Sequence, residues 1–374
     1  MRNYLYITLV AFAVTYLMTP LVRRIARRIG AITPVRDRDV HSVPVPRMGG
    51  TAMLIGFAAA MVTANHMPFL SRVFPNGNNG DGGDPWGVLL GATVVCVLGV
   101  IDDLWTLDAV TKLAGQAVAA VLMAWKGVQL ITLPIAGVTI PSAGTLLLLT
   151  VIIVVVTINA VNFVDGLDGL AAGIVGIAGS AFFVYSYLLS RDASVGDYSS
   201  LASLITAALV GCCLGFLPHN FNPARVFMGD SGSMLIGLLL ASATVAITGQ
   251  VDPTPVSQLK LVPAFFPLVL PLAVLALPLV DLLLAVVRRT RAGRMPWHPD
   301  KMHLHHRLLA LGHSHARAVL IMYVWTAIAA FGVASAKFVT PMQAVVGGLV
   351  AVAVATALTL GPLRGRRHRE RHAQ

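Results

Sequence analysis

Two asparagines and two aspartates follow a long apolar run of the chain. Residues 146–157 carry no charge, and Asn159, Asn162, Asp165 and Asp168 come soon after them. A carboxylate costs roughly 2.5–3.5 kcal/mol at the centre of a bilayer, so acids placed against such a run indicate a use for them. Asn159 and Asn162 are one helical turn apart and would offer amide oxygens on one face. The pattern is typical of an oxygen-rich ligand site, and a polar loop capped by aspartate is the alternative.

Adjacent aspartates and a lysine form a second candidate group. Asp102 and Asp103 end the third apolar run, and Lys112 opens the next one. Adjacent carboxylates can divide acid–base work, because a metal or Lys112 can keep one ionised while the other is driven toward neutrality. The alternative is a solvated turn with aspartate at the start of a helix, and Asp108 fits that alternative best.

The loop 219–233 carries a third group. Asp230 lies between Gly229 and Ser231 where the next apolar run begins. Mg²⁺ prefers oxygen ligands and is usually held by one or two carboxylates together with substrate phosphates, so Asp230 is a candidate magnesium ligand. Phe227 could offer a flat face to a nucleobase, although an aromatic residue at a membrane interface is an equally good interpretation.

A long loop at about 288–315 is rich in histidine and arginine. Its candidate residues are His303, His305, His306, Arg294 and Arg307. This density of donors suits a pyrophosphate group, which arginine and histidine neutralise and orient. A zinc site is the alternative, but no cysteine and no paired spacing accompany the histidines. Contact with anionic lipid would explain the arginines without explaining the histidines.

Composition identifies the elements that must position these groups as membrane helices. The chain of 374 residues is 56% hydrophobic and 11% charged, with a mean hydropathy of +0.79. A soluble domain carries about 25% charge, so the protein is predicted to be integral to a membrane. Its apolar runs are near twenty residues long, which favours helices over barrel strands. The basic residues lie beside these runs, so the net charge of +11 indicates membrane topology and no nucleic-acid binding.

The apolar runs predict an all-α polytopic bundle of about eleven transmembrane helices. The predicted spans are 3–22, 48–65, 86–101, 110–126, 144–160, 168–190, 200–217, 232–249, 262–287, 316–335 and 342–361. All but six of the 27 lysines and arginines fall in the loops after odd-numbered spans or in the C-terminal tail. The positive-inside rule therefore predicts an N-terminus outside the cell and a C-terminus in the cytoplasm.

The chain is interpreted as one polytopic membrane domain, 1–374, with a basic cytoplasmic tail at 362–374. The candidate groups all fall on the predicted cytoplasmic side, where they would build one active site. The contributing loops are about 102–112, 159–170, 219–233 and 288–315.

Four ordered motifs carry a family likeness. The stretches DDLWTLDAVTKL, NAVNFVDGLDGL, FMGDSGS and HLHHRL occur in this order in the predicted cytoplasmic loops. Together they resemble the polyprenyl-phosphate N-acetylhexosamine-1-phosphate transferases, a superfamily that includes the phospho-N-acetylmuramoyl-pentapeptide transferases. The form HLHHRL after an arginine-rich stretch is most similar to the N-acetylglucosamine-1-phosphate (GlcNAc-1-phosphate) branch, which uses undecaprenyl or decaprenyl phosphate.

The resemblance implies a reaction and its partners. GlcNAc-1-phosphate would pass from UDP-GlcNAc to a polyprenyl phosphate, with release of UMP, in the first lipid-linked step of a cell-envelope glycan. The enzyme would need Mg²⁺, with Mn²⁺ as a substitute. It would lie in the bacterial plasma membrane with its active site facing the cytoplasm. The oligomeric state stays open, with a homodimer as one option.

The resemblance also implies residue roles. Asp230 and Asn162 would bind the metal that bridges the diphosphate. Asp168 and Phe227 would hold uracil, and Lys112 would neutralise phosphate charge.

The remaining implied roles concern the acceptor lipid, the pyrophosphate and the sugar. Asp102 or Asp103 would lie near the phosphate acceptor, where either is a candidate base. A phosphate monoester with a second pKa near 6 is largely dianionic already, so the base is not obligatory. The groups expected around the pyrophosphate and sugar are His303, His305, His306 and Arg307. Further substrate contacts are expected from Asn159, Asp165 and Arg294.

Two other functions remain as alternatives. The phospho-N-acetylmuramoyl-pentapeptide transferase of peptidoglycan synthesis has the same chemistry with a different nucleotide sugar. A proton-coupled secondary transporter would also combine many spans with acids. Transporters keep their coupling residues near the bilayer midplane, whereas the acids here fall at one interface.

Overall fold

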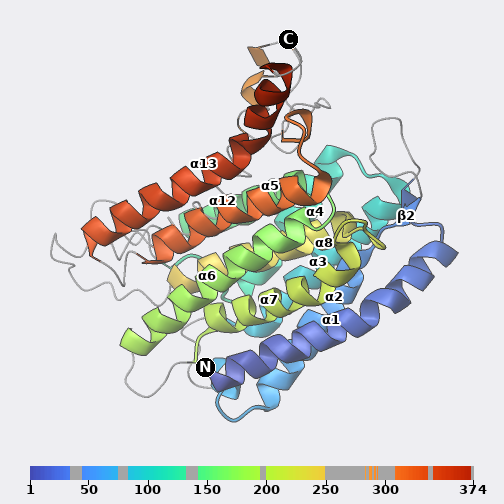
Figure 1. The fold of residues 1–374 in the computed structure, drawn as a ribbon. Coiled ribbons are helices and arrows are strands. Elements are labelled where there is room, and N and C mark those ends of the chain that lie inside the picture. The colour runs from blue at the N-terminus through green and yellow to red at the C-terminus, as the bar shows by residue number, and fades with distance from the viewer. Residues whose placement is uncertain are drawn as a thin grey trace.

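The computed structural model of the chain is almost entirely helical (Figure 1). It describes residues 1–33, 44–74, 83–131, 142–193, 199–248, 283, 286–288, 290, 291, 293, 308–335 and 340–371.

The helices run alongside one another and form a single bundle in Figure 1, and α13 extends past it at its C-terminal end. The α-helices are α1 (Arg2–Arg28), α2 (Gly49–His66), α3 (Pro85–Trp105), α4 (Ala109–Trp125), α5 (Ala143–Val164), α6 (Leu170–Ala193), α7 (Leu201–Asn220), α8 (Gly229–Thr248), α12 (His315–Ser335) and α13 (Pro341–Arg371). A 3₁₀ helix, η1 (Ser71–Val73), follows α2. Two short antiparallel strands, β1 (Ile32–Thr33) and β2 (Val45–Pro46), lie between α1 and α2.

Ten of the predicted spans coincide with these helices to within a few residues at most ends. Eight of the described helices are long and apolar enough to cross a membrane. The other two, α2 and α4, pack in the same bundle, and α4 is a shorter apolar helix. The protein is therefore a multi-pass helical membrane protein. The predicted ninth span, 262–287, lies almost wholly outside the described residues, so the total of eleven remains a prediction.

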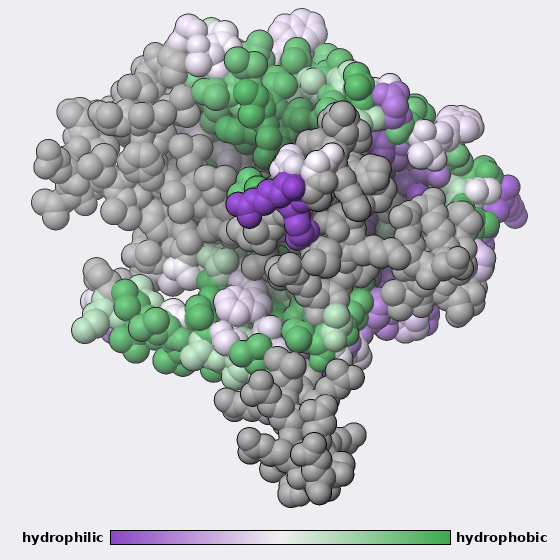
Figure 2. All heavy atoms as spheres, turned by 90° about the horizontal axis from the view of Figure 1, so that it is seen from above, coloured by the Kyte–Doolittle hydropathy of each residue, from purple (hydrophilic) through white to green (hydrophobic). Residues whose placement is uncertain are grey.

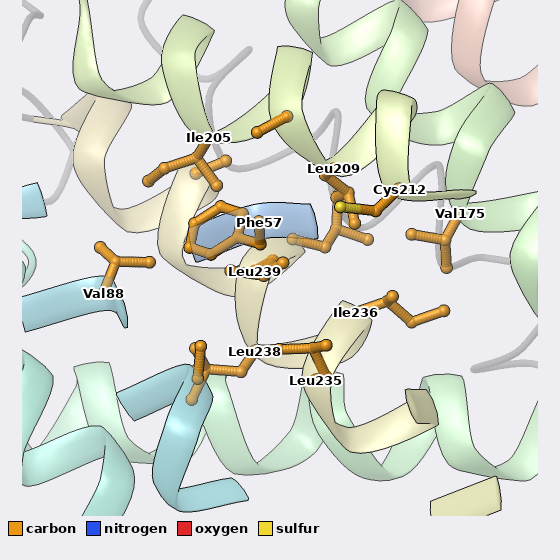
Figure 3. Close-up of a cluster of buried hydrophobic side chains, with 14 of the residues drawn as sticks. Phe57, Val88, Val175, Ile205, Leu209, Cys212, Leu235, Ile236, Leu238 and Leu239 are labelled. Carbon is orange, nitrogen blue, oxygen red and sulfur yellow. The ribbon is translucent and has the colours of Figure 1, made fainter. Parts of the chain in front are cut away.

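Helix α8 is the central element of the bundle. The apolar stretch of α8 is 100% buried, whereas that of α13 is only 6% buried. Helix α8 is therefore enclosed by protein, and α13 is peripheral. Figure 3 shows side chains of α8 packed among those of α2, α3, α6 and α7. The labelled residues are Leu235, Ile236, Leu238 and Leu239 of α8, with Phe57, Val88, Val175, Ile205, Leu209 and Cys212.

Small residues let two helices approach the start of α8. A Cβ atom on Gly50 of α2 would lie 2.2 Å from the backbone nitrogen of Gly232, and one on Gly99 of α3 would lie 2.3 Å from that of Ser231. Neither position can therefore hold a larger residue without moving the helices apart. This close packing fixes the N-terminal end of α8 relative to the C-terminal end of α3.

The outer surface matches a lipid environment. Large exposed apolar side chains are spread over α1, α4, α5 and α13. In Figure 2 green, apolar side chains gather in the upper part of the view and along its lower left, and purple, hydrophilic ones lie near the middle and along the right-hand side. The C-terminal end of α1 points to the same side in Figure 1. The polar end of the bundle is the end at which the candidate residues meet.

Candidate functional site

Lys112 joins two carboxylates from different helices. Its Nζ lies 2.7 Å from Oδ2 of Asp102 at the end of α3 and 2.8 Å from Oδ2 of Asp230 in the first turn of α8. Asp102 is buried, and Lys112 and Asp230 are half-buried. Ion pairs that are partly withdrawn from water are screened less than surface pairs, so this arrangement holds the start of α4 against the start of α8.

Asn162, a residue of α5, contacts the other carboxylate oxygen of Asp230. Its Nδ2 donates to Oδ1 of Asp230 at 3.2 Å and to Oγ of Ser233 at 2.8 Å. Ser233 in turn donates to the carbonyl of Gly229 at 3.2 Å, one turn earlier in α8. The amide of Asn162 is therefore oriented by two acceptors, and its own oxygen is left for another partner.

Asp103 has a different role from its neighbour. Its Oδ1 accepts the backbone N–H of Asp230 at 3.0 Å, and its Oδ2 accepts that of Ser231 at 3.3 Å. Both N–H groups belong to the first turn of α8, where the helix dipole favours a negative charge. Gly229 has φ +70°, and a Cβ there would lie 2.4 Å from the Asp103 carboxylate. Asp103 thus holds the helix start that carries Asp230.

These side chains form the carboxylate cluster of the site, drawn from α3, α4, α5 and α8. Its members are Asp102, Asp103, Lys112, Asn162 and Asp230. Two of the carboxylates pair with the one ammonium group and the third, Asp103, accepts N–H groups of α8, so the cluster holds more acidic than basic side chains. The structure therefore brings together the acids, the lysine and the asparagine that the sequence placed in three separate loops.

Asp168 anchors a second group of contacts. Its Oδ2 accepts Nδ2 of Asn222 and the backbone N–H of Ala224, both at 3.0 Å. The neighbouring peptide is held as well, since Oδ1 of Asn220 accepts the N–H of Gly169 at 3.0 Å. Asn220 also donates to the carbonyl of Val226 at 2.9 Å. The start of α6 is thereby fixed to the loop that leads to α8.

Helix α12 reaches the same peptide. Tyr323 donates its hydroxyl proton to the carbonyl of Gly169, which has φ +76°. A Cβ on Gly173 would collide with the Tyr323 ring at 1.9 Å, so glycine is required for this approach. We call this second group, Asp168, Gly169, Asn220, Asn222 and Tyr323, the amide cluster.

Phe227 is positioned by backbone contacts with the segment before α2. Its N–H donates to the carbonyl of Pro46 at 2.8 Å, and its carbonyl accepts the N–H of Gly49 at 3.1 Å. The half-buried ring lies three residues before Asp230 and three after Ala224. The loop that carries Phe227 therefore connects it to Asp230 of the carboxylate cluster on one side and to Ala224, which contacts Asp168 of the amide cluster, on the other.

Asp165 lies just past the end of α5, within the electrostatic reach of both clusters. Burial raises the pKa of its carboxyl to about 7, and repulsion from Asp230 and Asp103 acts in the same direction. Arg47 opposes this rise in pKa, which places a cation of the β2–α2 segment near the site. A carboxyl with this pKa changes its charge in the physiological pH range.

Asn159 lies one turn before Asn162 on α5. Its Nδ2 donates to Oε1 of the buried Gln116 at 2.7 Å and to the carbonyl of Val155 at 2.8 Å. The amide is thus used to join α5 to α4, and its substrate contact remains a prediction. The predicted residues Arg294, His303, His305, His306 and Arg307 lie outside the described residues.

Several polar residues of the site escaped the sequence analysis. Ser233 could have been found, because it lies three residues after Asp230 and so on the same face of a helix. Gln116 lies in the predicted span 110–126 among apolar neighbours and carried no motif. Asn220 lies in the predicted loop 219–233, but its residue type and position did not single it out there. Tyr323 gave no signal, since aromatic residues are common in membrane helices.

The oxygen atoms of the carboxylate cluster fit a divalent cation. Within the described ranges, no group of three or more histidine, cysteine, aspartate or glutamate side chains forms a complete metal cage. Mg²⁺ does not require one, because it commonly uses one or two protein oxygens and takes the rest from phosphates and water. Asp230 would provide a carboxylate oxygen, and Asn162, whose nitrogen donates to Asp230 and Ser233, would provide its amide oxygen. The acidic side chains around them favour a cation.

The chain has relatives among known proteins. Residues 85–248 match the model of glycosyl transferase family 4. A decaprenyl-phosphate N-acetylglucosaminephosphotransferase of Mycobacterium tuberculosis is 45% identical over 367 residues, which cover 97% of this chain and 90% of the relative. A relative from Bacillus subtilis, named a probable undecaprenyl-phosphate N-acetylglucosaminyl 1-phosphate transferase, is 33% identical over 84% of this chain and 81% of its own length. A phospho-N-acetylmuramoyl-pentapeptide-transferase of Desulforudis audaxviator is 30% identical over 88% of this chain and 96% of its own length.

Proposed function

The chain belongs to the polyprenyl-phosphate N-acetylglucosamine-1-phosphate transferases of glycosyl transferase family 4, and we propose that it transfers GlcNAc-1-phosphate from UDP-GlcNAc to a polyprenyl phosphate. The products are polyprenyl-diphospho-GlcNAc and UMP. The observation that carries the proposal is the carboxylate cluster, in which Lys112 and Asn162 orient Asp230 at the polar end of an apolar bundle. A polyprenyl chain can approach such a site through the bilayer, and a nucleotide can approach it from water.

The proposed reaction is a phosphoryl transfer. An oxygen of the acceptor phosphate forms a bond with the β-phosphorus of UDP-GlcNAc, and the bond from that phosphorus to the UMP oxygen breaks. The electron pair of the broken bond stays with UMP. Such reactions need little covalent help from the protein and depend on positioning and charge neutralisation. Lys112 supplies a cation held in place by two carboxylates, which limits its reorganisation during the reaction.

Mg²⁺ is the cofactor that the site would take, with Mn²⁺ as a substitute. Asp230 and Asn162 would hold it together with oxygens of the diphosphate. When bound, the ion polarises the phosphoryl group and neutralises charge on the leaving UMP.

The two adjacent aspartates take different parts in this proposal. Asp103 has both carboxylate oxygens engaged by N–H groups of α8, so it acts as a positioning residue for Asp230. Asp102 accepts the N–H of Leu107 at 2.6 Å with one oxygen and pairs with Lys112 through the other. Since a phosphate monoester is largely dianionic at neutral pH, Asp102 is not required as a base, and we assign it to orienting Lys112.

The amide cluster and Phe227 form the proposed nucleobase side. Asp168 is fixed by Asn222 and Ala224 through one oxygen, which leaves its orientation well defined. A carboxylate can accept an N–H of uracil, and an aromatic ring can stack on its face. We therefore place uracil between Asp168 and Phe227.

The site is proposed to face the cytoplasm of a bacterial plasma membrane. Arg23, Arg24, Arg27 and Arg28 end α1 at the polar end of the bundle, on the same side as the site. The positive-inside rule assigns such an end to the cytoplasm. UDP-sugars are then available on the side at which the site opens.

The test is UMP release by the purified full-length protein in detergent, given UDP-GlcNAc, polyprenyl phosphate and Mg²⁺. UMP that requires both the lipid and the metal is expected, with EDTA as the metal control. The muramoyl-pentapeptide nucleotide is run in parallel, because one relative at 30% identity is a pentapeptide transferase. UMP from that nucleotide alone would move the protein to peptidoglycan synthesis, and UMP from neither would refute the reaction.

A further inference from the structure

Basic side chains gather where the end of α1 meets the loop between α7 and α8. Arg23 lies close enough to Arg27 and Arg225 for their charges to act on one another. His219, in the last turn of α7, interacts electrostatically with Arg225 and Arg23. Like charges placed together destabilise one another unless an anion lies among them. We call these four residues the basic cluster.

Backbone contacts hold the basic cluster together. Nε2 of His219 lies 3.1 Å from the carbonyl oxygen of Tyr16 on α1, and the two rings are 4.8 Å apart. The carbonyl of His219 accepts the N–H of Arg225 at 2.9 Å. Arg225 is therefore fixed at the end of α7, beside α1. The junction of two helices and a loop therefore holds three arginines beside one histidine in a fixed arrangement.

The cluster lacks a negative partner in the described part of the chain. No carboxylate there forms an ion pair with Arg23, Arg27 or Arg225. The Nε atom of Arg23 is buried and has no hydrogen-bond acceptor among the described residues. A buried guanidinium donor without an acceptor is unfavourable, so this position calls for an oxygen anion.

The place of the cluster indicates which anion it takes. It lies at the polar end of α1, an apolar helix long enough to span a membrane, and so at the depth of lipid headgroups. Arginine forks match phosphate oxygens, and basic residues beside a span attract anionic lipid. We propose that Arg23, Arg27, His219 and Arg225 bind the phosphate of an anionic phospholipid headgroup.

This lipid site is connected to the amide cluster by one short loop. Arg225 follows Ala224, whose N–H donates to Asp168, and precedes Val226, whose carbonyl accepts from Asn220. A headgroup held by Arg225 would stabilise the loop that orients Asp168 and Phe227. The effect on turnover rests on the proposed function, whereas the lipid binding does not.

The test uses the full-length protein in bilayer discs of phosphatidylcholine, with or without phosphatidylglycerol. Native mass spectrometry after release into detergent measures the phosphatidylglycerol that stays bound. Arg23→Gln and Arg225→Gln should each reduce this retention by more than about fivefold, because each removes a direct contact with phosphate in addition to the roughly fivefold attraction of one arginine to an anionic membrane surface. Arg24→Gln is the matched control, because it removes the same charge from the same turn of α1 outside the cluster.

A specific site requires a smaller loss in the control than in the two cluster variants. Equal losses in all three would mean attraction to a basic surface, and unchanged retention in the cluster variants would also overturn the site. Displacement of the lipid by millimolar inorganic phosphate would assign the cluster to a free anion. Near-wild-type melting temperatures show that the variants are folded. The double variant Asp37→Asn, Asp39→Asn removes carboxylates outside the described residues and should leave retention unchanged. A large gain would mean that those acids neutralise the arginines.

UMP release in the same discs tests the connection to turnover. Phosphatidylglycerol should raise turnover of the wild-type protein severalfold, and this stimulation should be lost in Arg225→Gln. Stimulation that survives in that variant would overturn the connection. Absence of UMP from all proteins would refute the proposed reaction, while the retention result would still decide the lipid site.

Discussion

The carboxylate cluster and the amide cluster lie at the same end of the bundle but are built from different interactions. In the carboxylate cluster, charged side chains of α3, α4 and α8 contact one another directly, with Asn162 as the neutral member. In the amide cluster, one carboxylate is surrounded by neutral amide, peptide and hydroxyl groups. The first arrangement suits charge neutralisation in a transition state, and the second suits recognition of a neutral base. Substitutions in the first should therefore lower the turnover number, and substitutions in the second should weaken nucleotide binding.

Asp230→Ala should give the largest loss. It removes the carboxylate shared by Lys112 and Asn162 and the proposed metal ligand, so the turnover number should fall at least about 10³-fold. The measurement is UMP release at saturating UDP-GlcNAc and Mg²⁺. Ser242→Ala, a buried serine farther along α8 that donates only within the bundle, is the matched control and should retain most of the activity. Near-normal turnover of Asp230→Ala at high Mg²⁺ would contradict the assignment of the carboxylate cluster to catalysis.

Asp103→Asn should have the next largest effect. The amide cannot match a carboxylate that accepts two N–H groups at the start of α8, so Asp230 would lose its fixed position. Removal of a residue that orients a ligand typically costs about 10–100-fold in activity, and a smaller loss than in Asp230→Ala is expected. The apparent affinity for Mg²⁺ should weaken in the same variant, and titration of UMP release with Mg²⁺ measures this. An unchanged Mg²⁺ titration would mean that Asp103 serves only the fold.

The sequence predicted the helices and the side of the bundle on which the acids meet. The alternation of apolar runs and polar breaks placed Asp102, Lys112 and Asp230 at one end of the bundle. Asp102 and Lys112 come after the third predicted span and Asp230 after the seventh, and all connections after odd-numbered spans lie on the same side. The sequence could not separate Asp102 from Asp103, since adjacent carboxylates look alike until the start of α8 is placed beside one of them. Only part of the amide cluster could be predicted from the sequence. Asp168 belonged to a motif, whereas Tyr323 comes from a helix far along the chain and depends on tertiary packing.

Tyr323→Phe tests the amide cluster. The change keeps the ring against Gly173 but leaves the carbonyl of Gly169 without its hydroxyl partner. Loss of one buried hydrogen bond costs about 1 kcal/mol, so the KM for UDP-GlcNAc should rise about fivefold. The turnover number and the KM for polyprenyl phosphate should change little. Tyr185→Phe, a buried tyrosine of α6 outside the cluster, is the control for a general effect on packing. A fall in turnover at unchanged KM would erase the distinction between the two clusters.

Asp165 tests the comparison through the smallest expected effect, a pH-dependent change in stability, because the carboxylates of both clusters act on its charge. Its pKa of about 7 lies above the ordinary value of 3.8, with burial as the main cause. Between these two pH values, the folded protein holds a proton that the unfolded chain has released. Stability should therefore fall as the pH rises from about 4 to about 7. Asp165→Asn removes this titration, so its melting temperature should exceed that of the wild type by about 2–4 °C at pH 8 and match it near pH 4.

Asp108 provides the control of opposite sign for this pH dependence. It caps α4, and its hydrogen bond with the Thr111 hydroxyl, followed by the Thr111 N–H, holds the pKa of its carboxyl below the ordinary value. The stability from Asp108 is thus present at neutral pH and lost on acidification, so Asp108→Asn should lower the melting temperature at pH 8. Both variants are measured by thermal unfolding in EDTA, which removes divalent cations from the carboxylate cluster. If Asp165→Asn also lowered the melting temperature at pH 8, Asp165 would be a stabilising anion. The excess negative charge between the two clusters would then have to be balanced by cations of the chain, such as Arg47.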